Sequence, residues 1–315
     1  MARSNTTDGV FKPCRWHALT AALALGVLVP CRLQSSSPQS LMAFASVPPP
    51  QGPKRVTQRP GNTMGAVPVL MYHRLGDKES HMVRSRENFR RDLARLYKLG
   101  FRPVTLKEYA TNTMSLQPGA SPVVITFDDS WPDQLRLLKD GSVDPHCFVG
   151  EWLSFNKTRP DFPVKATFFA LKNGPFGQKG LGRRKIKMLQ DWGSEIASHT
   201  ISHVDLSKST DQTIREEVGE SVLWLESMGA KVTSFAPPYG AFPRSSHLKS
   251  GFNYKGRRFV FSAVAAAGAG PARSPQDRKF RPKLIPRIKA YEGSRGVHWW
   301  LDKAVAKKLD VYVQP

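Results

Sequence analysis

The sequence contains few cysteines, few acidic residues for its number of basic ones, and no long apolar run. Its 315 residues include three cysteines, Cys14, Cys31 and Cys147. Two of these lie in a presumed targeting segment, so only Cys147 would remain in a mature chain. This excludes a disulfide framework and a cysteine-rich zinc site. Any metal must therefore be held by histidines and carboxylates.

The longest apolar stretch, residues 18–29, is too short to span a membrane, which takes roughly 20 residues. It follows a short basic segment, and this layout is typical of a signal peptide. We expect residues 1–33 to be a signal peptide or lipoprotein signal, and the protein to be exported to a periplasmic, envelope-anchored or extracellular location. The cleavage site stays open. The lipidation of Cys31 also stays open, because a proline directly before this cysteine, Pro30, fits a lipoprotein box poorly.

The charge balance is strongly basic, with 47 Lys and Arg against 25 Asp and Glu, a net charge of +22 and a pI of about 10.2. A pI above 9 is consistent with nucleic-acid binding. However, the basic residues are spread along the chain, and no zinc-finger, RNP or basic-zipper pattern is present. We therefore expect a solvated basic surface, or one suited to an anionic cell envelope, and no nucleic-acid partner.

The chain divides into a linker and one large domain. Residues 34–65 are rich in Ser, Pro, Gln and Gly and are predicted to be a linker. In residues 66–315, short buried strands alternate with helices, which predicts a mainly parallel sheet or an α/β barrel. Strands are expected at 67–72, 122–127, 165–170, 195–198, 234–236, 259–267 and 284–288, helices at 87–99, 186–192 and 211–228, and a long loop with one short helix at 131–164. Ser209 and Gln212 are expected to form a capping box at the start of the helix 211–228.

Two polar clusters follow predicted strands, where parallel α/β folds place their chemistry. Asp128 and Asp129 end the strand 122–127, and two carboxylates there are costly unless a cation or proton compensates them. The alternative is a loop pair that caps a helix. His199 and His203 stand four residues apart, so one helical turn would let both hold one metal. The alternative is two surface histidines.

A third cluster, residues 235–240 (FAPPYG), is a turn held rigid by two prolines. Such a turn can present a backbone N–H to a reacting group, although a purely structural turn is the alternative. Together the three clusters resemble the polysaccharide deacetylase family, the NodB-homology domain of carbohydrate esterase family 4. The matching segments are VPVLMYHRL (67–75), VVITFDD (123–129), KATFFA (165–170), EIASHTISHVDL (195–206), SFAPPYG (234–240) and LIPRI (284–288).

This resemblance implies a distorted (β/α)7 barrel with one divalent metal ion. Asp129, His199 and His203 would be the metal ligands. Zinc is the expected ion, with cobalt or nickel as alternatives. Two histidines and one carboxylate leave coordination positions open for water and substrate, as hydrolysis requires.

The resemblance also implies the catalytic roles. Asp128 would be the catalytic base, and the backbone N–H of Tyr239 would line the oxyanion hole. Pro238 and Trp131 would also bind the substrate. The sequence departs from the family pattern at Ser130-Trp131, where the family usually continues with Gly.

Two further departures concern the base and the acid. Ala236 stands where the family usually carries the Arg that orients the base, and Arg287 is the candidate substitute. No L-x-H segment follows Arg287 at the expected place. In a permuted branch of the family, which resembles poly-N-acetylglucosamine deacetylases, the matching strand lies at the N-terminal edge of the domain. We therefore nominate His73 as the general acid, with His298 as its rival.

The sequence thus predicts a metal-dependent hydrolase that removes N-acetyl groups from polymers containing N-acetylglucosamine, such as poly-N-acetylglucosamine, peptidoglycan or chitin-like chains. We expect an acetylated polysaccharide as the partner, no transmembrane span in the mature domain, and a monomer. Two alternatives remain: an O-acetyl esterase acting on a polysaccharide, and a catalytically silent carbohydrate-binding barrel.

Overall fold

The computed structural model describes residues 59–172 and 175–315. The predicted signal segment and most of the predicted linker lie outside these residues. Within them, no helix has both the length and the apolar character needed to cross a membrane. Asn62 pairs with Val313 and Ala66 with Val311, so the last residues of the predicted linker lie against the C-terminal segment.

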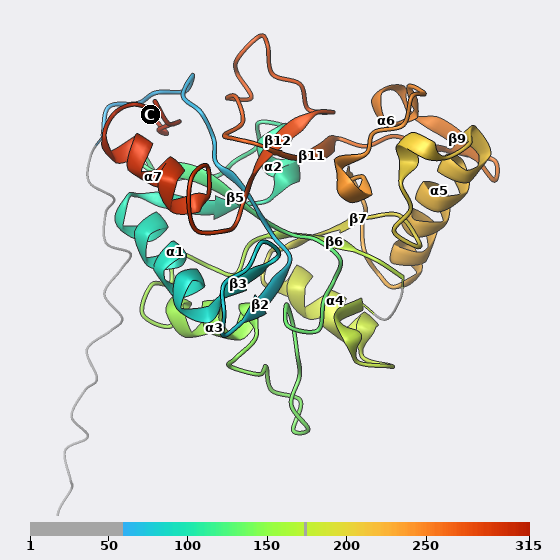
Figure 1. The fold of residues 1–315 in the computed structure, drawn as a ribbon, viewed down its shortest axis with the longest axis horizontal. Coiled ribbons are helices and arrows are strands. Elements are labelled where there is room, and N and C mark those ends of the chain that lie inside the picture. Colours follow the sequence, from blue (N-terminus) through green and yellow to red (C-terminus); the bar gives the residue numbers. More distant parts are fainter. Residues whose placement is uncertain (1–58, 173–174) are drawn as a thin grey trace, which may run out of the picture. The chain divides into compact units, whose positions relative to one another are not determined.

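Seven parallel strands close into a barrel (Figure 1). The ring closes because β1 pairs with β12 on one edge and with β5 on the other. An eighth strand, β4, pairs with the first half of β5. The prediction of a distorted (β/α)7 barrel is confirmed. The strands, in ring order, are β1 (Val69–Tyr72), β12 (Ile285–Lys289), β11 (Ala263–Ala269), β8 (Ser234–Phe235), β7 (Glu195–Ser198), β6 (Thr167–Ala170) and β5 (Ser121–Phe127), with β4 at Phe101–Val104.

Strands β1, β5, β6, β7 and β8 are buried along their whole length, and side chains of a strand alternate between the barrel interior and the helix layer. In β5, Val123, Ile125 and Phe127 join the core cluster that contains the residues of the outer helices, whereas Val124 joins the cluster inside the barrel. Asp128 lies four residues after Val124 and therefore points to the same face as Val124. The alternation therefore directs this carboxylate into the barrel mouth.

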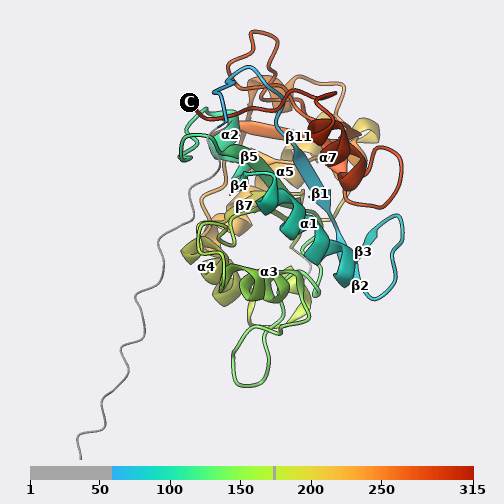
Figure 2. The ribbon, with the colours of Figure 1, turned by 90° about the vertical axis from the view of Figure 1, so that its left-hand side faces the viewer.

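Helices cover the outside of the barrel, and α1, α3 and α4 lie on the same side of the strands in both views (Figures 1 and 2). Helix α1 begins where Ser85 accepts a hydrogen bond from the Asn88 N–H, and it buries Phe89, Leu93 and Leu96. The helices are α1 (Arg86–Lys98), α2 (Leu106–Ala110), α3 (Phe148–Asn156), α4 (Gly182–Asp191), α5 (Asp211–Ser227), α6 (His247–Ser250) and α7 (Val297–Val305).

Short elements complete the fold. Two small two-stranded sheets are formed by β2 (Arg74–Gly76) with β3 (Val83–Ser85), and by β9 (Phe252–Tyr254) with β10 (Arg257–Phe259). Single 3-10 turns are η1 (Pro175–Gly177), η2 (Leu206–Lys208) and η3 (Pro238–Gly240).

The structure corrects three local predictions. The strand expected at 259–267 is divided between β10 and β11, and helix α4 begins at Gly182, four residues before the predicted start. The capping box predicted from Ser209 and Gln212 is wrong. Thr210 is the N-cap of α5, and its side chain accepts a hydrogen bond from the backbone N–H of Thr213.

A buried ionic network joins α1, β1, β3 and α7 on the outside of the barrel. Arg84 donates two hydrogen bonds to Asp92, at 2.8 and 2.6 Å, and the Tyr72 hydroxyl donates a third at 2.8 Å. His298 Nε2 lies 3.0 Å from Asp92, and its Nδ1 lies 3.0 Å from Glu292. The rival acid His298 is therefore committed to this network.

The network predicts a pH-dependent stability. The Asp92 carboxylate raises the pKa of His298 above its ordinary value of 6.5. The stabilisation is therefore complete below the unfolded-state pKa and is lost as the pH rises through the folded-state pKa. We expect His298→Gln to lower the free energy of unfolding by roughly 1–2 kcal/mol at about pH 5.5 and by less at about pH 8.5, measured by urea unfolding. An equal loss at both pH values would show that no charged pair forms.

Candidate functional site

The predicted chemical residues meet at one mouth of the barrel. His73 follows β1, Asp128 and Asp129 follow β5, and His199 follows β7, so each stands at the carboxyl end of a parallel strand. These ends surround a cavity of about 280 Å³ that is lined by His73, both aspartates, His203 and Arg287, among others. The position agrees with the rule that barrel sites lie at the carboxyl ends of the strands.

Asp129, His199 and His203 form a compact cluster of potential ligand atoms, all within 4.8 Å of one another. Asp129 Oδ1 lies 3.3 Å from His199 Nε2 and 3.2 Å from His203 Nε2. His199 Nδ1 lies 2.7 Å from the carbonyl oxygen of Ala236. Because a carbonyl can only accept, Nδ1 carries the hydrogen, and in the neutral ring the lone pair of Nε2 faces Asp129.

This donor set fits a divalent cation. Asp129 Oδ1 is buried without a hydrogen-bond partner, while its Oδ2 accepts a hydrogen bond from Trp131 Nε1 at 2.9 Å. Burial raises the pKa of Asp129, but hydrogen bonds from the His199 and His203 rings, when these rings are protonated, more than offset this effect, so the pKa lies well below its usual range and the carboxylate is charged. A buried anion facing an imidazole lone pair is costly unless a cation lies between them. One carboxylate and two imidazoles suit zinc and similar ions.

The loops that carry the site adopt backbone conformations that side chains other than glycine rarely take. The φ angles are +72° at Asp129, +50° at Ser130, +66° at Thr200, +63° at His203 and +60° at Tyr239. Each such residue costs of order 1–3 kcal/mol, and residues of this kind concentrate at functional sites. Strain at five positions around one cavity indicates that the fold holds these side chains in place for a purpose other than stability.

The histidine pair is presented by a strained loop, and the predicted helical turn is wrong. Two left-handed residues, Thr200 and His203, fold the loop back so that both imidazoles face Asp129. Glu217 on α5 holds this loop, because its carboxylate accepts hydrogen bonds from the N–H groups of Ile201 at 3.1 Å and Ser202 at 3.0 Å.

Arg287 and Asp128 form a buried bidentate ion pair. Arg287 donates to the two carboxylate oxygens of Asp128 at 2.6 and 2.9 Å, and its Nε donates to the carbonyl of Ala266 at 2.7 Å. Burial alone would raise the pKa of Asp128, but the charges of Arg287, His199 and His73 and the hydrogen bonds from Arg287 together outweigh it, so the pKa lies below its ordinary value. Arg287 thus makes the contact expected of a residue that orients the base in place of the Arg missing at Ala236.

His73 lies next to the same carboxylate, with its Nε2 3.7 Å from Asp128 Oδ2. Burial lowers the pKa of His73 and outweighs the opposite effect of the two aspartates, so its imidazolium form gives up a proton readily. Gln134 fixes both residues, because its Nε2 donates to the backbone carbonyls of His73 at 2.8 Å and Asp128 at 2.5 Å.

The remaining predicted site residues lie at the rim. The Tyr239 side chain is exposed, and its hydroxyl lies 3.1 Å from His203 Nδ1. Among the described backbone hydrogen bonds, the N–H groups of Gly240 and Ala241 donate to carbonyls of the same turn, whereas that of Tyr239 donates to none. An uncommitted N–H beside the cavity agrees with the oxyanion role, which stays a prediction.

Trp131 and Pro238 do not line the main cavity. Trp131 lines an adjoining groove of about 350 Å³, and the Arg74 guanidinium lies 4.5 Å from its ring centre. Pro238 is buried within its turn, whereas the preceding Pro237 lines the cavity. The substrate-binding roles of Trp131 and Pro238 therefore stay predictions.

The comparison with known protein families agrees with this site. Residues 116–254 match the model of the family described as polysaccharide deacetylase. The chain is therefore similar to polysaccharide deacetylases over this stretch, which is less than half of its length. It is 26% identical over 178 residues to YxkH of Bacillus subtilis (strain 168), whose name places it in the same family. The matched region is 56% of this chain and 57% of that protein, so the chain spans little more than half of this relative's length.

Solved structures of deacetylases share the fold. A polysaccharide deacetylase from Bacillus cereus is 20% identical with a TM-score of 0.57, and the match covers 76% of this chain and 69% of the other. Deacetylase PplD of Streptococcus pyogenes, solved in complex with acetate, is 17% identical with a TM-score of 0.56, and the match covers 76% and 98%.

Two residues that hold the loops of this site could not be found from the sequence. Gln134 lies in a segment predicted as irregular loop, and Glu217 lies on the solvent side of a predicted helix. Both act through backbone groups of other segments, which leaves no residue pattern along the chain. Only the three-dimensional contacts identify them.

The ligand assignment predicts the metal content of single variants. Replacing His199 or His203 with Ala removes one of three protein ligands. Metal affinity should fall by about 100-fold or more, since even losing a residue that only supports a ligand costs about 10–100-fold. Bound metal is measured by elemental mass spectrometry after dialysis, and the exposed His146→Ala serves as the control. Full occupancy in both ligand variants would show that the assignment is wrong.

Proposed function

We propose that the chain is a metal-dependent N-deacetylase of polysaccharides that contain N-acetylglucosamine. The observation that carries this proposal is the shared cavity of two functional units. One unit is the Asp129, His199 and His203 cluster, and the other is the Asp128 carboxylate, which Arg287 holds 3.7 Å from His73. A base, an acid and a set of metal ligands in one cavity form a complete hydrolytic site.

The reaction follows from the positions of these groups. A divalent ion held by Asp129, His199 and His203 would supply Lewis-acid polarisation of the acetamide carbonyl and would make water more acidic. Asp128 takes a proton from the attacking water, whose oxygen bonds to the carbonyl carbon. The backbone N–H of Tyr239 stabilises the negative oxygen of the tetrahedral adduct.

His73 then completes the reaction by protonating the nitrogen as the carbon–nitrogen bond breaks, which releases acetate and the free amine of a glucosamine unit. Because Asp128 lies 3.7 Å from His73, the proton taken from water can recharge the imidazole. The contact of Arg287 with Asp128 keeps the base charged, which argues against a silent carbohydrate-binding barrel.

Several finer features belong to the same proposal. Zinc is the proposed ion, because the ligand set is two imidazoles and one carboxylate. The groove beside Trp131 is the proposed place for the neighbouring sugars of a polymer. Export and a monomeric state are proposed from the sequence alone. An O-acetyl esterase would use the same site, and His73 separates the two activities.

The base assignment is tested with Asp128→Asn. The amide cannot accept a proton at neutral pH, so acetate release from N-acetylglucosamine oligomers should fall by about 10²–10⁴-fold. Metal content should stay unchanged, because Asp129 and the two histidines remain. The exposed Asp140→Asn is the matched control and should keep full activity. Near-normal turnover in Asp128→Asn would remove this residue from the mechanism.

The acid assignment is tested with His73→Ala on two substrates. An amide nitrogen must be protonated before it leaves, whereas the aryloxide of an activated aryl acetate needs no proton. Amide hydrolysis should therefore fall by about 10²–10⁴-fold and aryl acetate hydrolysis by much less, with metal retained. Equal losses on both substrates would indicate a structural role for His73. An unaffected variant would exclude it as the acid.

A further inference from the structure

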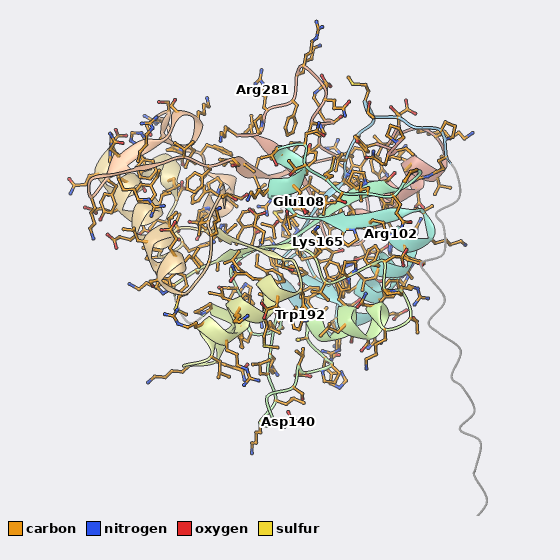
Figure 3. The ribbon with its side chains drawn as sticks, turned by 180° about the vertical axis from the view of Figure 1, so that it is seen from behind. Arg102, Glu108, Asp140, Lys165, Trp192 and Arg281 are labelled. Atoms are coloured by element: carbon orange, nitrogen blue, oxygen red, sulfur yellow. The ribbon has the colours of Figure 1, made fainter. Side chains whose placement is uncertain are left out.

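The segment that joins β11 to β12 forms a projecting basic loop. No helix is present in residues 270–284, and Figure 1 shows this loop extending from the barrel above β11 and β12. Figure 3 shows Arg281 on it, with its side chain directed away from the body of the molecule. Within this short segment the chain places Arg273, Arg278, Lys279, Arg281 and Lys283.

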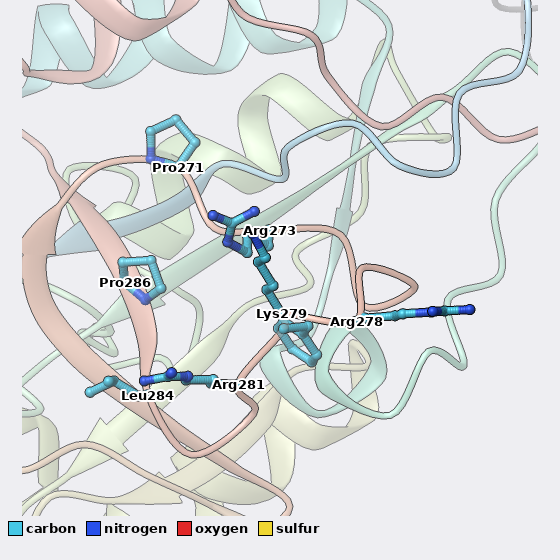
Figure 4. A pocket seen from close by; sticks show the side chains of 8 residues that line it. Pro271, Arg273, Arg278, Lys279, Arg281, Leu284 and Pro286 are labelled. Atoms are coloured by element: carbon cyan, nitrogen blue, oxygen red, sulfur yellow. The ribbon is translucent and has the colours of Figure 1, made fainter.

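The loop encloses a cavity of about 530 Å³, which exceeds the 280 Å³ of the metal-site cavity. This volume lies in the range of small-molecule sites, roughly 300–1,000 Å³. Pro271, Phe280, Leu284 and Pro286 supply apolar surface, and four of the loop cations complete the lining. Figure 4 shows both proline rings on one side of the cavity and Arg278 extending away on the other.

The cations of this cavity are mostly uncompensated. Arg273 pairs with Asp277 at 2.8 Å. Among the residues that the structure describes, no carboxylate lies within ion-pair distance of Arg278, Lys279 or Arg281, and all three are exposed. Three like charges in one short loop repel one another unless an anion lies between them. The loop therefore has the charge of a binding site for an anion.

This cavity is separate from the metal site. Pro286 lines the basic cavity, and the next residue of β12, Arg287, lies inside the barrel against Asp128. Successive side chains of a strand point to opposite faces, so the barrel wall lies between the two cavities. A ligand in the loop would be held without contacting the reacting groups.

We propose that this loop cavity binds a segment of an anionic glycan. The carboxylate or phosphate groups of the glycan would pair with Arg278, Lys279 and Arg281, and a sugar ring would pack its C–H face on Leu284 and the prolines. Leu284 is 43% exposed. A small inorganic ion would not cover this apolar surface, whereas a sugar ring would.

The lining argues against single-stranded nucleic acid as the ligand. Sites for single strands use free aromatic rings on which bases stack. Phe280 is the one aromatic residue of the lining, and its ring is in edge-to-face contact with Tyr109, with the ring centres 5.3 Å apart. The site would hold the protein on an anionic polymer, independently of the deacetylation proposed above.

The test compares two variants of equal charge. The loop variant carries Arg278→Gln, Lys279→Gln and Arg281→Gln, and the control carries Lys139→Gln, Lys179→Gln and Lys308→Gln at exposed sites elsewhere. Binding is measured by titration calorimetry with oligogalacturonate, a ribitol phosphate oligomer, a neutral N-acetylglucosamine oligomer and single-stranded DNA. We expect the loop variant to bind at least one of the two anionic glycans about tenfold or more weakly, and the control to change less than about twofold.

Each other outcome overturns the proposal. Equal losses in the two variants would show that only the net charge matters. Tighter binding of DNA than of either glycan, lost in the loop variant, would assign the site to nucleic acid. Leu284→Asp should also weaken glycan binding, and normal binding there would exclude packing of a sugar ring. Acetate release from the neutral oligomer should be unchanged in the loop variant, so this readout reports on the proposed deacetylase activity separately.

Discussion

The ion pair between Arg287 and Asp128 is the interaction on which the site depends. Both side chains are almost completely buried, at 1% and 4% exposure, and two isolated charges there would be very costly. The bidentate geometry and the additional bond to Ala266 compensate much of that cost. Since Asp128 follows β5 and Arg287 lies in β12, on either side of β1, the pair also fixes the relation of three neighbouring strands at the barrel mouth.

Around this pair, the barrel strands orient some of the site's side chains, and the loops after the strands place the others. The alternation of strand side chains points Asp128, His199 and Arg287 inward. Strained backbone then turns Asp129 and His203 toward the same point. Contacts from Gln134 and Glu217 hold these conformations, although neither side chain contacts the candidate metal ligands. The resulting arrangement leaves Asp129 Oδ1 buried and without a hydrogen-bond partner, which supports the proposed role of this residue as a metal ligand.

Much of this could be predicted from the sequence, because the chemical residues directly follow buried apolar strands such as 122–127 and 195–198. Their convergence follows from parallel topology, and the contact of Arg287 with Asp128 matches the predicted replacement for the Arg missing at Ala236. Other features could not be predicted. Nothing in the residues between His199 and His203 distinguishes a helical turn from a loop with two left-handed residues. The commitment of His298 to Asp92 also depends on packing between α1 and α7, which the sequence does not encode locally.

The most direct test of this account is the release of acetate from N-acetylglucosamine oligomers by the intact chain. The protein is assayed as purified, after treatment with a chelator, and after zinc, cobalt or nickel is restored. The account predicts that acetate release is lost with the chelator and returns with a divalent ion. Acetate release that persists after the metal has been removed, with its absence verified by elemental analysis, would contradict it.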